Sequence, residues 1–448
     1  MGTGKKQKKA ALKYSIPSKR KKYTQEHLLK KASSAHREGR LAEAEKGYLE
    51  ILKKKPDWGA VLNALGTVFM DQAQLDKAQR VFEKATELRP PYSPAYYNLA
   101  RLKQSKNDLK GAISIYRDML EKQPDFGQAW NNLGTAYRDT GDLDEALSCF
   151  RKAVEFAPGM AEAWNNLGVA QDEFNMIQDA AKSYERAIEI RSDYASAHFN
   201  LGISLQKLGV FKEAEDHYKK VLKTKPDDKS ARFMLQSLGT LETPDAAPAE
   251  YVRRVFDECA GTFEKTLVEN LGYKTPKLLF DLVLPYLTEE MTVLDLGCGT
   301  GLGSQFYRPF AKKLIGADVS LKMLEKAAKK KTYDRLEAVD ILQDWEFPQK
   351  FDLIYSSDVF VYFGNLDPVI SSASSFLNYS GIIAFSVERL DDSMGHRLFP
   401  SGRYAHSQAY IQDVLSRHGL HILKAAKADI RKESGDQVKG LLFVAKKY

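Results

Sequence analysis

The chain has 448 residues, of which 43% are hydrophobic and 11% aromatic, which is enough apolar material for more than one compact core. It has no apolar run long enough to cross a membrane and no apolar stretch behind its basic start, so we expect no transmembrane helix, no secretory signal and a cytoplasmic location. Its three cysteines form no Cys-x-x-Cys pair, which excludes a cysteine-based zinc site and fits a reducing compartment.

The net charge of +8 is concentrated at the N-terminus. Nine lysines and arginines and no acidic residue stand among the first 22 residues, so the rest of the chain carries a net charge near −1. We interpret residues 1–24 as a basic disordered tail that can contact nucleic acid or an acidic membrane, or act as a nuclear address. The nearly neutral remainder argues against a protein that mainly wraps a polyanion.

Residues 25–241 repeat every 34 residues. An aromatic residue, a small residue and a proline recur at this interval, in register with Ala44, Ala78, Ala112, Ala146, Ala180 and Ala214. Small residues let two helices approach, the aromatic residue fills the seam and the proline ends the second helix, so each period predicts a helix pair. The pattern resembles the tetratricopeptide repeats, which implies six units in a right-handed α-superhelix. Lys229–Leu241 predicts a closing helix, and residues 242–250 predict a proline-bearing linker.

Stacked helix pairs leave a concave groove that commonly holds a protein or peptide partner. One polar position recurs in the first helices of four units, at Asn98, Asn132, Asn166 and Asn200. A side-chain amide both donates and accepts, so this row can grip the backbone of an extended peptide. It resembles the asparagine ladder in the repeat arrays of O-GlcNAc transferases. The alternative is a structural role, because asparagine before Leu-Gly is common in the tetratricopeptide consensus.

The remaining segment, residues 251–448, contains a glycine-rich motif behind an apolar run. Acid and glycines alternate there at Asp295, Gly297, Gly299 and Gly301. This pattern predicts a strand, a tight turn and a helix, the first unit of a doubly wound α/β sheet that binds its ligand at the carboxyl ends of the strands. Leu302 stands where a dinucleotide fingerprint needs glycine. The motif instead resembles that of class I S-adenosylmethionine-dependent methyltransferases.

That resemblance implies a Rossmann-like, seven-stranded domain over residues 251–448 and S-adenosyl-L-methionine as the methyl donor. Asp318 ends the second predicted strand and is suited to the ribose hydroxyls, while Asp340 ends the third and would bind the adenine amino group. The donor-binding residues expected from the family are Asp295, Gly297, Cys298, Gly299, Gly301, Asp318, Val319, Asp340, Ile341 and Ser356. The segment around Phe256 and Phe263 resembles the aromatic segment that folds over the donor in related enzymes, with plain helix packing as the alternative.

The acceptor is less well defined by the sequence. The segment after the fourth predicted strand lacks the Asn-Pro-Pro-aromatic signature of many amino-group methyltransferases and has no cysteine, which disfavours adenine or glutamine nitrogen and cytosine carbon as acceptors. Methyl transfer depends mainly on alignment and on exclusion of water. For a hydroxyl or carboxyl acceptor, the candidate catalytic or positioning residues are Asp358, Tyr362, Glu388, Tyr404 and His406. For His406 the alternative is a surface residue at a helix start.

We therefore predict a multidomain α plus α/β enzyme that transfers a methyl group directly to a protein or peptide recruited by the repeat groove. The alternatives are a small-molecule or glycan methyltransferase with the repeats as a scaffold, an inactive scaffold, and RNA methylation. Apart from contacts of the tail, we expect no nucleic-acid partner, no membrane partner and no metal.

Overall fold

The computed structural model describes residues 24–89, 92–261, 263–264, 272–391, 395–433 and 436–448. The chain forms two compact units, residues 1–115 and 116–448. The predicted tail lies outside the described residues except for Thr24, which caps the first helix by accepting a hydrogen bond from the backbone nitrogen of His27.

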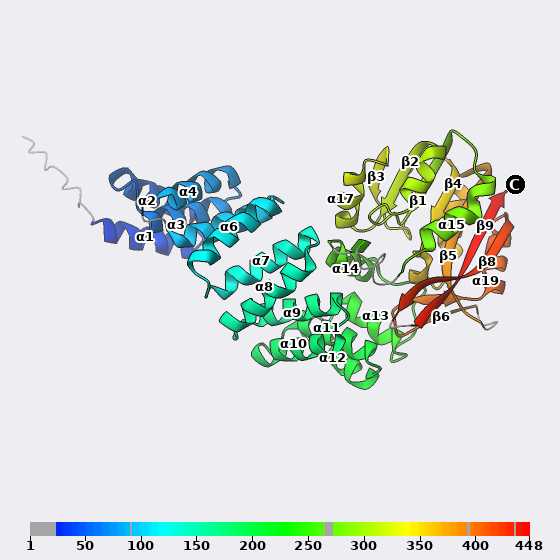
Figure 1. Cartoon of the computed structure of the whole chain (residues 1–448), viewed down its shortest axis with the longest axis horizontal. Helices are drawn as coiled ribbons and strands as arrows, with labels where there is room; N and C mark the ends of the chain where they lie inside the picture. The colour runs from blue at the N-terminus through cyan, green and yellow to red at the C-terminus, as the bar shows by residue number, and fades with distance from the viewer. Residues whose placement is uncertain (1–23, 90–91, 262, 265–271, 392–394, 434–435) are drawn as a thin grey trace, which may run out of the picture. The chain divides into compact units, whose positions relative to one another are not determined.

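The first unit consists of helix pairs, as the 34-residue period predicts. Its helices are α1 (Gln25–Arg37), α2 (Leu41–Lys54), α3 (Gly59–Asp71), α4 (Leu75–Glu87), α5 (Ser93–Ser105) and the first part of α6 (Leu109–Lys122) (Figure 1). α1 packs against α2, and α3 packs against α4. A Cβ on Gly66 would lie 2.3 Å from the ring of Phe82, so the small residue of one helix lets the aromatic residue of the next pack directly on its backbone.

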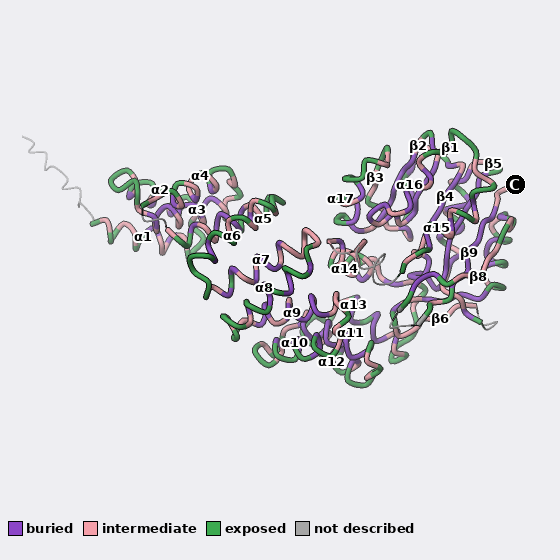
Figure 2. Tube along the Cα trace, in the orientation of Figure 1, coloured by how far each residue is buried: buried purple, intermediate pink, exposed green. Residues whose placement is uncertain are grey.

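The second unit continues the array. Its repeat helices are α7 (Gly127–Thr140), α8 (Leu143–Phe156), α9 (Ala161–Glu173), α10 (Ile177–Ile190), α11 (Ala195–Lys207), α12 (Phe211–Thr224) and α13 (Lys229–Ser237). The repeating alanines and aromatics of this part are buried, as Figure 2 shows for the helix seams. The predicted helix pairs are thereby confirmed, and α13 covers the last of them.

In the rest of the second unit, the described residues build a sheet of nine strands. Its strands are β1 (Met291–Leu296), β2 (Ala311–Asp318), β3 (Arg335–Ala338), β4 (Phe351–Ser356), β5 (Leu377–Arg389), β6 (His396–Leu398), β7 (Tyr404–His406), β8 (Leu420–Glu433) and β9 (Asp436–Lys447). β3, β2, β1, β4 and β5 are parallel neighbours in that order, β9 joins β5 antiparallel, and β8 joins β9. The predicted α/β architecture is confirmed, and the short strands β6 and β7 extend it beside β5.

Helices and 3-10 turns connect these strands. They are α14 (Ala249–Cys259), α15 (Thr275–Val283), η2 (Leu284–Tyr286), α16 (Ser304–Tyr307), η3 (Arg308–Phe310), α17 (Leu321–Lys330), η4 (Phe360–Tyr362), α18 (Asp367–Phe376) and α19 (Gln408–Arg417). Successive side chains of β1 point to opposite faces of the sheet. Val293 packs in the core beneath α15, and Leu294 packs in the core on the other face. The sheet is therefore buried on both sides.

One hydrophobic core joins the last repeats to the sheet. It contains Tyr184, Tyr218 and Phe233 from the repeats together with Leu294 and Phe385 from the strands. The predicted linker is also fixed, because the backbone oxygen of Asp245 accepts a hydrogen bond from Gly364 nitrogen at 2.7 Å. The boundary between compact units accordingly falls in α6 rather than at the linker.

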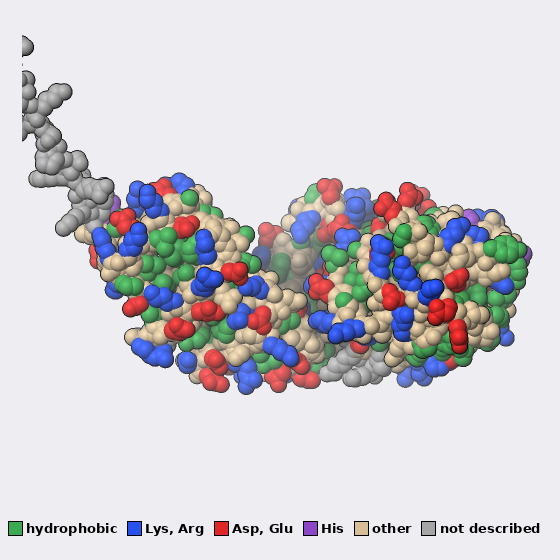
Figure 3. All heavy atoms as spheres, turned by 90° about the horizontal axis from the view of Figure 1, so that it is seen from above, with side chains coloured by type: hydrophobic (Ala, Val, Ile, Leu, Met, Phe, Trp, Pro, Cys, Tyr) green, Lys and Arg blue, Asp and Glu red, His purple; other side chains and the backbone are tan. Residues whose placement is uncertain are grey.

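Charge is mixed over the surface. On the face drawn in Figure 3, basic and acidic side chains alternate and do not gather into one basic stripe. Among the described residues, no helix is long and apolar enough to cross a membrane.

Candidate functional site

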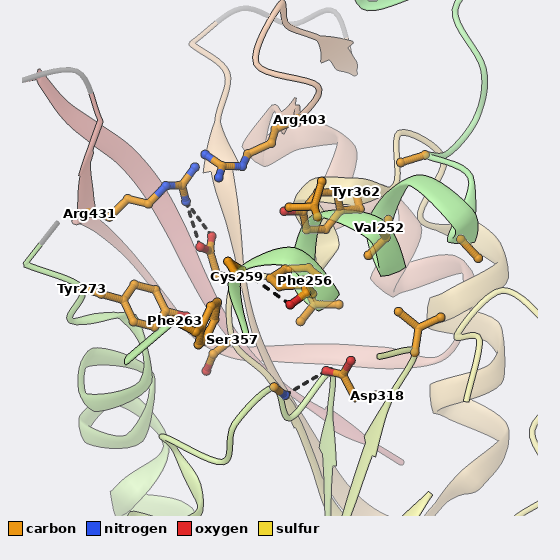
Figure 4. A pocket seen from close by; sticks show the side chains of 18 of the residues that line it. Val252, Phe256, Cys259, Phe263, Tyr273, Asp318, Ser357, Tyr362, Arg403 and Arg431 are labelled. Carbon is orange, nitrogen blue, oxygen red and sulfur yellow. Dashed lines mark hydrogen bonds and ion pairs between the residues drawn. The ribbon is translucent and has the colours of Figure 1, made fainter. Parts of the chain in front are cut away.

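A cavity of about 710 Å³ lies where the parallel strands end. Its walls are the glycine turn after β1, the ends of β2, β3 and β4, helix α14, and the far end of β8 (Figure 4). The repeats add a further wall, formed by Asp172, Glu173, Phe174, Asn175 and Lys207. The strand ends were expected from the sequence, whereas the repeat wall was not.

The glycine turn keeps the floor of the cavity free of side chains. Gly297 has a φ of +76° and a Cβ there would lie 2.3 Å from Val359 Cγ2, so the position excludes any larger residue. Gly299 has a φ of +52° and its backbone nitrogen donates to Asp318 Oδ2 at 2.8 Å. A Cβ on Gly299 would meet nothing closer than the ring of Phe263 at 3.7 Å, which leaves open space above this backbone.

Six of the ten expected donor-binding residues line the cavity, namely Gly297, Gly299, Asp318, Val319, Asp340 and Ile341. The other four, Asp295, Cys298, Gly301 and Ser356, do not line it. Asp295 supports the turn from below, because its Oδ2 accepts hydrogen bonds from the hydroxyls of Tyr333 at 2.6 Å and Tyr355 at 2.5 Å. Burial raises the pKa of Asp295 to about 7.

Asp318 is oriented by its neighbours. It is 7% exposed, and its Oδ1 accepts the backbone nitrogen of Ser320 at 2.8 Å while Oδ2 accepts that of Gly299. Burial raises the pKa of Asp318 above its ordinary value, although these backbone hydrogen bonds favour the carboxylate. The carboxyl is thus held in one orientation at the cavity wall.

Helix α14 forms the apolar side of the cavity. Val252, Phe256 and Cys259 line it, and the ring of Phe256 packs edge-on at 5.8 Å against both Phe263 and Tyr362. The aromatic segment singled out in the sequence therefore does border the cavity. Burial raises the pKa of the Tyr362 phenol, so this side chain stays neutral near pH 7.

A buried ionic cluster borders the side of the cavity opposite α14. Arg431 donates to both carboxylate oxygens of Asp358, at 2.7 and 3.0 Å, and also to Glu388. Arg403 lies 3.9 Å from Glu388 and also lines the cavity. Asp358, predicted as a catalytic residue, is therefore ion-paired and lies at the cavity wall. Arg431 was missed because nothing in its local sequence marks it; it stands near the end of β8 and pairs with a residue 73 positions away.

His406 and Tyr404 do not line the cavity. His406 is fully buried, its Nε2 lies 2.8 Å from the backbone oxygen of Phe363, and burial lowers its pKa to about 4. The Tyr404 hydroxyl donates to the backbone oxygen of Pro244 at 2.6 Å. Both side chains are used to hold backbone segments, so we correct the expectation that they act in catalysis.

The asparagine row makes contacts between repeats. In the first unit, Asn98 Nδ2 donates to Asn63 Oδ1 at 2.8 Å. In the second unit, equivalent bonds run from Asn166 to Asn131 at 2.9 Å and from Asn200 to Asn165 at 3.2 Å, and Asn132 Oδ1 accepts from Asn131 at 3.4 Å. Bonds of this kind are what the structural alternative for these residues expects.

Family models identify both parts of the chain. A methyltransferase-domain model matches residues 269–425, and three tetratricopeptide-repeat models match residues 69–136, 125–193 and 175–229.

The chain is also similar to individual proteins. It is 28% identical over 137 residues to a malonyl-[acyl-carrier protein] O-methyltransferase of Hamiltonella defensa, which covers 30% of this chain and 51% of the relative. It is 32% identical over 113 residues to the protein of the same name from Priestia megaterium, a match that covers 25% of this chain and 41% of that relative. The chain thus spans about half the length of these curated relatives or less.

Among solved structures, a putative S-adenosylmethionine-dependent methyltransferase from Listeria monocytogenes matches with 23% identity and a TM-score of 0.33, covering 38% of this chain and 97% of that one. The family models show that the chain combines tetratricopeptide repeats with a methyltransferase domain.

Proposed function

We propose that this protein is an S-adenosylmethionine-dependent methyltransferase whose acceptor belongs to a protein or peptide recruited by the repeats. The observation that carries the proposal is the composition of the cavity wall. Strand ends of the methyltransferase domain form one side, and the turn Asp172–Asn175 of the repeat array forms another. An acceptor that reaches the methyl donor therefore lies against the repeats.

The residues present fit the methyl donor. Two glycines leave the backbone of the turn open to the cavity, Asp318 and Asp340 offer carboxylates at successive strand ends, and Ile341 offers an apolar surface. When bound, S-adenosylmethionine supplies an electrophilic methyl group on a sulfonium. Asp318 is assigned to the ribose hydroxyls, and Asp340 with Ile341 to the adenine.

The chain itself contributes alignment and exclusion of water. Phe256, Phe263 and Tyr362 surround the cavity with aromatic surface, which keeps the reacting groups dry. The Ser357 hydroxyl also lines the cavity, and its Oγ is buried and finds no partner among the described residues. We assign this hydroxyl to a hydrogen bond with the acceptor, and the neighbouring Asp358–Arg431 ion pair to positioning the loop that carries it.

The curated relatives support an oxygen acceptor presented by a protein. Their name describes methylation of a malonyl group carried on an acyl carrier protein. A carrier protein is too large to enter the cavity and would have to dock beside it. The repeats bordering the cavity supply a surface of the kind that binds proteins.

The test is a transfer assay with methyl-labelled S-adenosylmethionine and an extract of the source cell, separated into protein, RNA and small-molecule fractions. Gly299→Arg is the blank, because a long side chain there would enter the open space above the turn. Fractionation is preferable to deleting residues 25–240, because the last repeats share a core with the sheet and their removal would expose it.

We expect label in the protein fraction, and binding of S-adenosylhomocysteine that is lost in the Gly299→Arg variant. Label confined to small molecules would refute the protein acceptor and assign the repeats to scaffolding. A protein that neither binds S-adenosylhomocysteine nor transfers label above the blank would be an inactive scaffold.

A further inference from the structure

The wall contributed by the repeats differs chemically from the rest of the cavity. It comes from the end of α9 and the turn that follows it, with Lys207 from the end of α11 beside it. The residues already assigned to the methyl donor all stand at strand ends of the sheet. The repeat wall is therefore available to the acceptor. The chemistry of its side chains limits the kind of acceptor that can bind there.

Asp172 on this wall has its full set of partners. Its Oδ2 accepts the hydroxyls of Tyr184 at 2.9 Å and Ser204 at 3.1 Å, and its Oδ1 accepts Lys207 Nζ at 3.2 Å. These bonds fix the end of α9 against α10 and α11. Asp172 thus serves the packing of the repeats and has no need of a ligand.

Glu173, the next residue, is in the opposite situation. It lines the cavity, and its Oε2 is buried with no hydrogen-bond partner among the described residues. A buried carboxyl oxygen without a partner is costly, because it has lost water and gained nothing in exchange. A donor from a molecule in the cavity can satisfy such an atom.

The charges around Glu173 make that donor a cation. Asp139 from α7, Asp172 from α9 and Glu258 from α14 face it, and Arg138 is the base that acts on it most. Of these acids, Asp172 is paired with Lys207, and Glu258 with Arg254 at 3.1 Å. Burial, with the neighbouring acids, raises the pKa of Glu173 to about 7. Arg138 makes no hydrogen bond with Glu173 Oε2, so this oxygen is open to a further positive donor and disfavours an anion.

We propose that Glu173 forms an acceptor subsite for a cationic nitrogen, such as the ammonium group of a lysine side chain near the methylated position. The proposal rests on the proposed function, since it describes the acceptor of that same cavity. A cation there would give Glu173 a charge-assisted hydrogen bond, and Phe174 of the same turn adds an aromatic side chain of the kind that suits cations. The repeats would thus select the acceptor as well as recruit it.

The experiment measures binding of three capped amino acids to the full-length protein saturated with S-adenosylhomocysteine. The probes are Nα-acetyl-lysine methylamide, Nα-acetyl-norleucine methylamide and Nα-acetyl-glutamate methylamide, which differ in charge at similar size. The variant is Glu173→Gln. Its matched control is Glu185→Gln, which removes the same charge from an exposed position on α10 of the same repeat.

We expect the lysine probe to bind about tenfold more tightly than the norleucine probe, from one charge-assisted hydrogen bond in a partly buried site. This preference should disappear in Glu173→Gln and persist in Glu185→Gln. In the unchanged protein it should also fall as the pH is lowered through about 7, because the carboxylate is lost below its pKa. The pH series needs no variant and guards against misfolding of Glu173→Gln.

Three results would overturn the proposal. They are equal binding of the lysine and norleucine probes, tighter binding of the glutamate probe, and a cation preference that survives in Glu173→Gln. In the last of these cases, weaker binding of S-adenosylhomocysteine to Glu173→Gln would place this carboxyl in the donor site. If S-adenosylhomocysteine does not bind at all, the proposed function fails, and the same probes titrated without it still decide the role of Glu173.

Discussion

Gly297→Ala should impair the glycine turn through two separable effects. The φ of +76° costs an L-residue about 1–2 kcal/mol. The new Cβ would also lie 2.3 Å from Val359 Cγ2 and 2.9 Å from Val359 Cγ1, and overpacking of this kind costs roughly 1–3 kcal/mol. If both terms act on the conformation that binds the donor, affinity for S-adenosylhomocysteine should fall by about 30-fold or more.

The two effects can be divided by a double-mutant cycle. Val359→Ala removes both γ-carbons, so Gly297→Ala combined with Val359→Ala should recover most of the overpacking part and leave the backbone strain with a 3.1 Å contact to Cβ of residue 359. Calorimetric titration of S-adenosylhomocysteine into the four proteins measures this coupling directly. Effects of the two substitutions that add to within about 0.5 kcal/mol would refute the clash as the cause.

The remaining predictions concern three buried groups. Arg431→Met should destabilise the protein by about 3–5 kcal/mol, because it leaves the carboxylates of Asp358 and Glu388 buried without the arginine that pairs with them. Adding Asp358→Asn and Glu388→Gln should restore most of the lost stability, measured by thermal melting. A single variant as stable as the triple variant would contradict this account. Burial raises the pKa of Asp295 to about 7 in the folded chain, against an ordinary value of 3.8, so the folded state binds more protons than the unfolded state between these values. The melting temperature should therefore fall as the pH rises from about 4 to about 7. Asp295→Asn should flatten this fall, and an unchanged slope would show that Asp295 does not cause it. His406→Gln should lower the melting temperature but leave the pH profile of methyl transfer per folded molecule unchanged, whereas a changed profile would return His406 to the chemistry.

The order of elements could be predicted because its signals are local. A 34-residue period and a run of alternating glycines are properties of neighbouring residues, and they led directly to the helix pairs and to the turn after β1. The strand-end residues Asp318 and Asp340 followed, since parallel strands that end together bring their last residues to one edge.

Residues that act through distant partners could not be predicted. Arg431 is 73 positions from Asp358, and nothing in its local sequence marks it as the partner of that residue. The repeat wall has no local signature, because Glu173 is an ordinary helix end until α14 packs beside it and the cavity forms. Asp295 and His406 show the reverse case, since neither lines the cavity. Their residue types suit a ligand or a base, but burial is decided by tertiary packing, and both support backbone and hydroxyl groups from within.

Helix α14 explains how the repeats and the cavity can depend on one another. On one face, Arg254 lies 3.8 Å above the ring of Phe199, and Tyr251 packs at 4.8 Å against Phe233, both of the repeats. On the other face, Phe256 and Cys259 line the cavity. Under the proposed function, a polypeptide held by these repeats would lie beside the cavity, since the repeats form one of its walls and pack against the helix that forms another. The same arrangement means that foreign repeats fused N-terminal to α14 would have to reproduce its packing surface before they could redirect the enzyme.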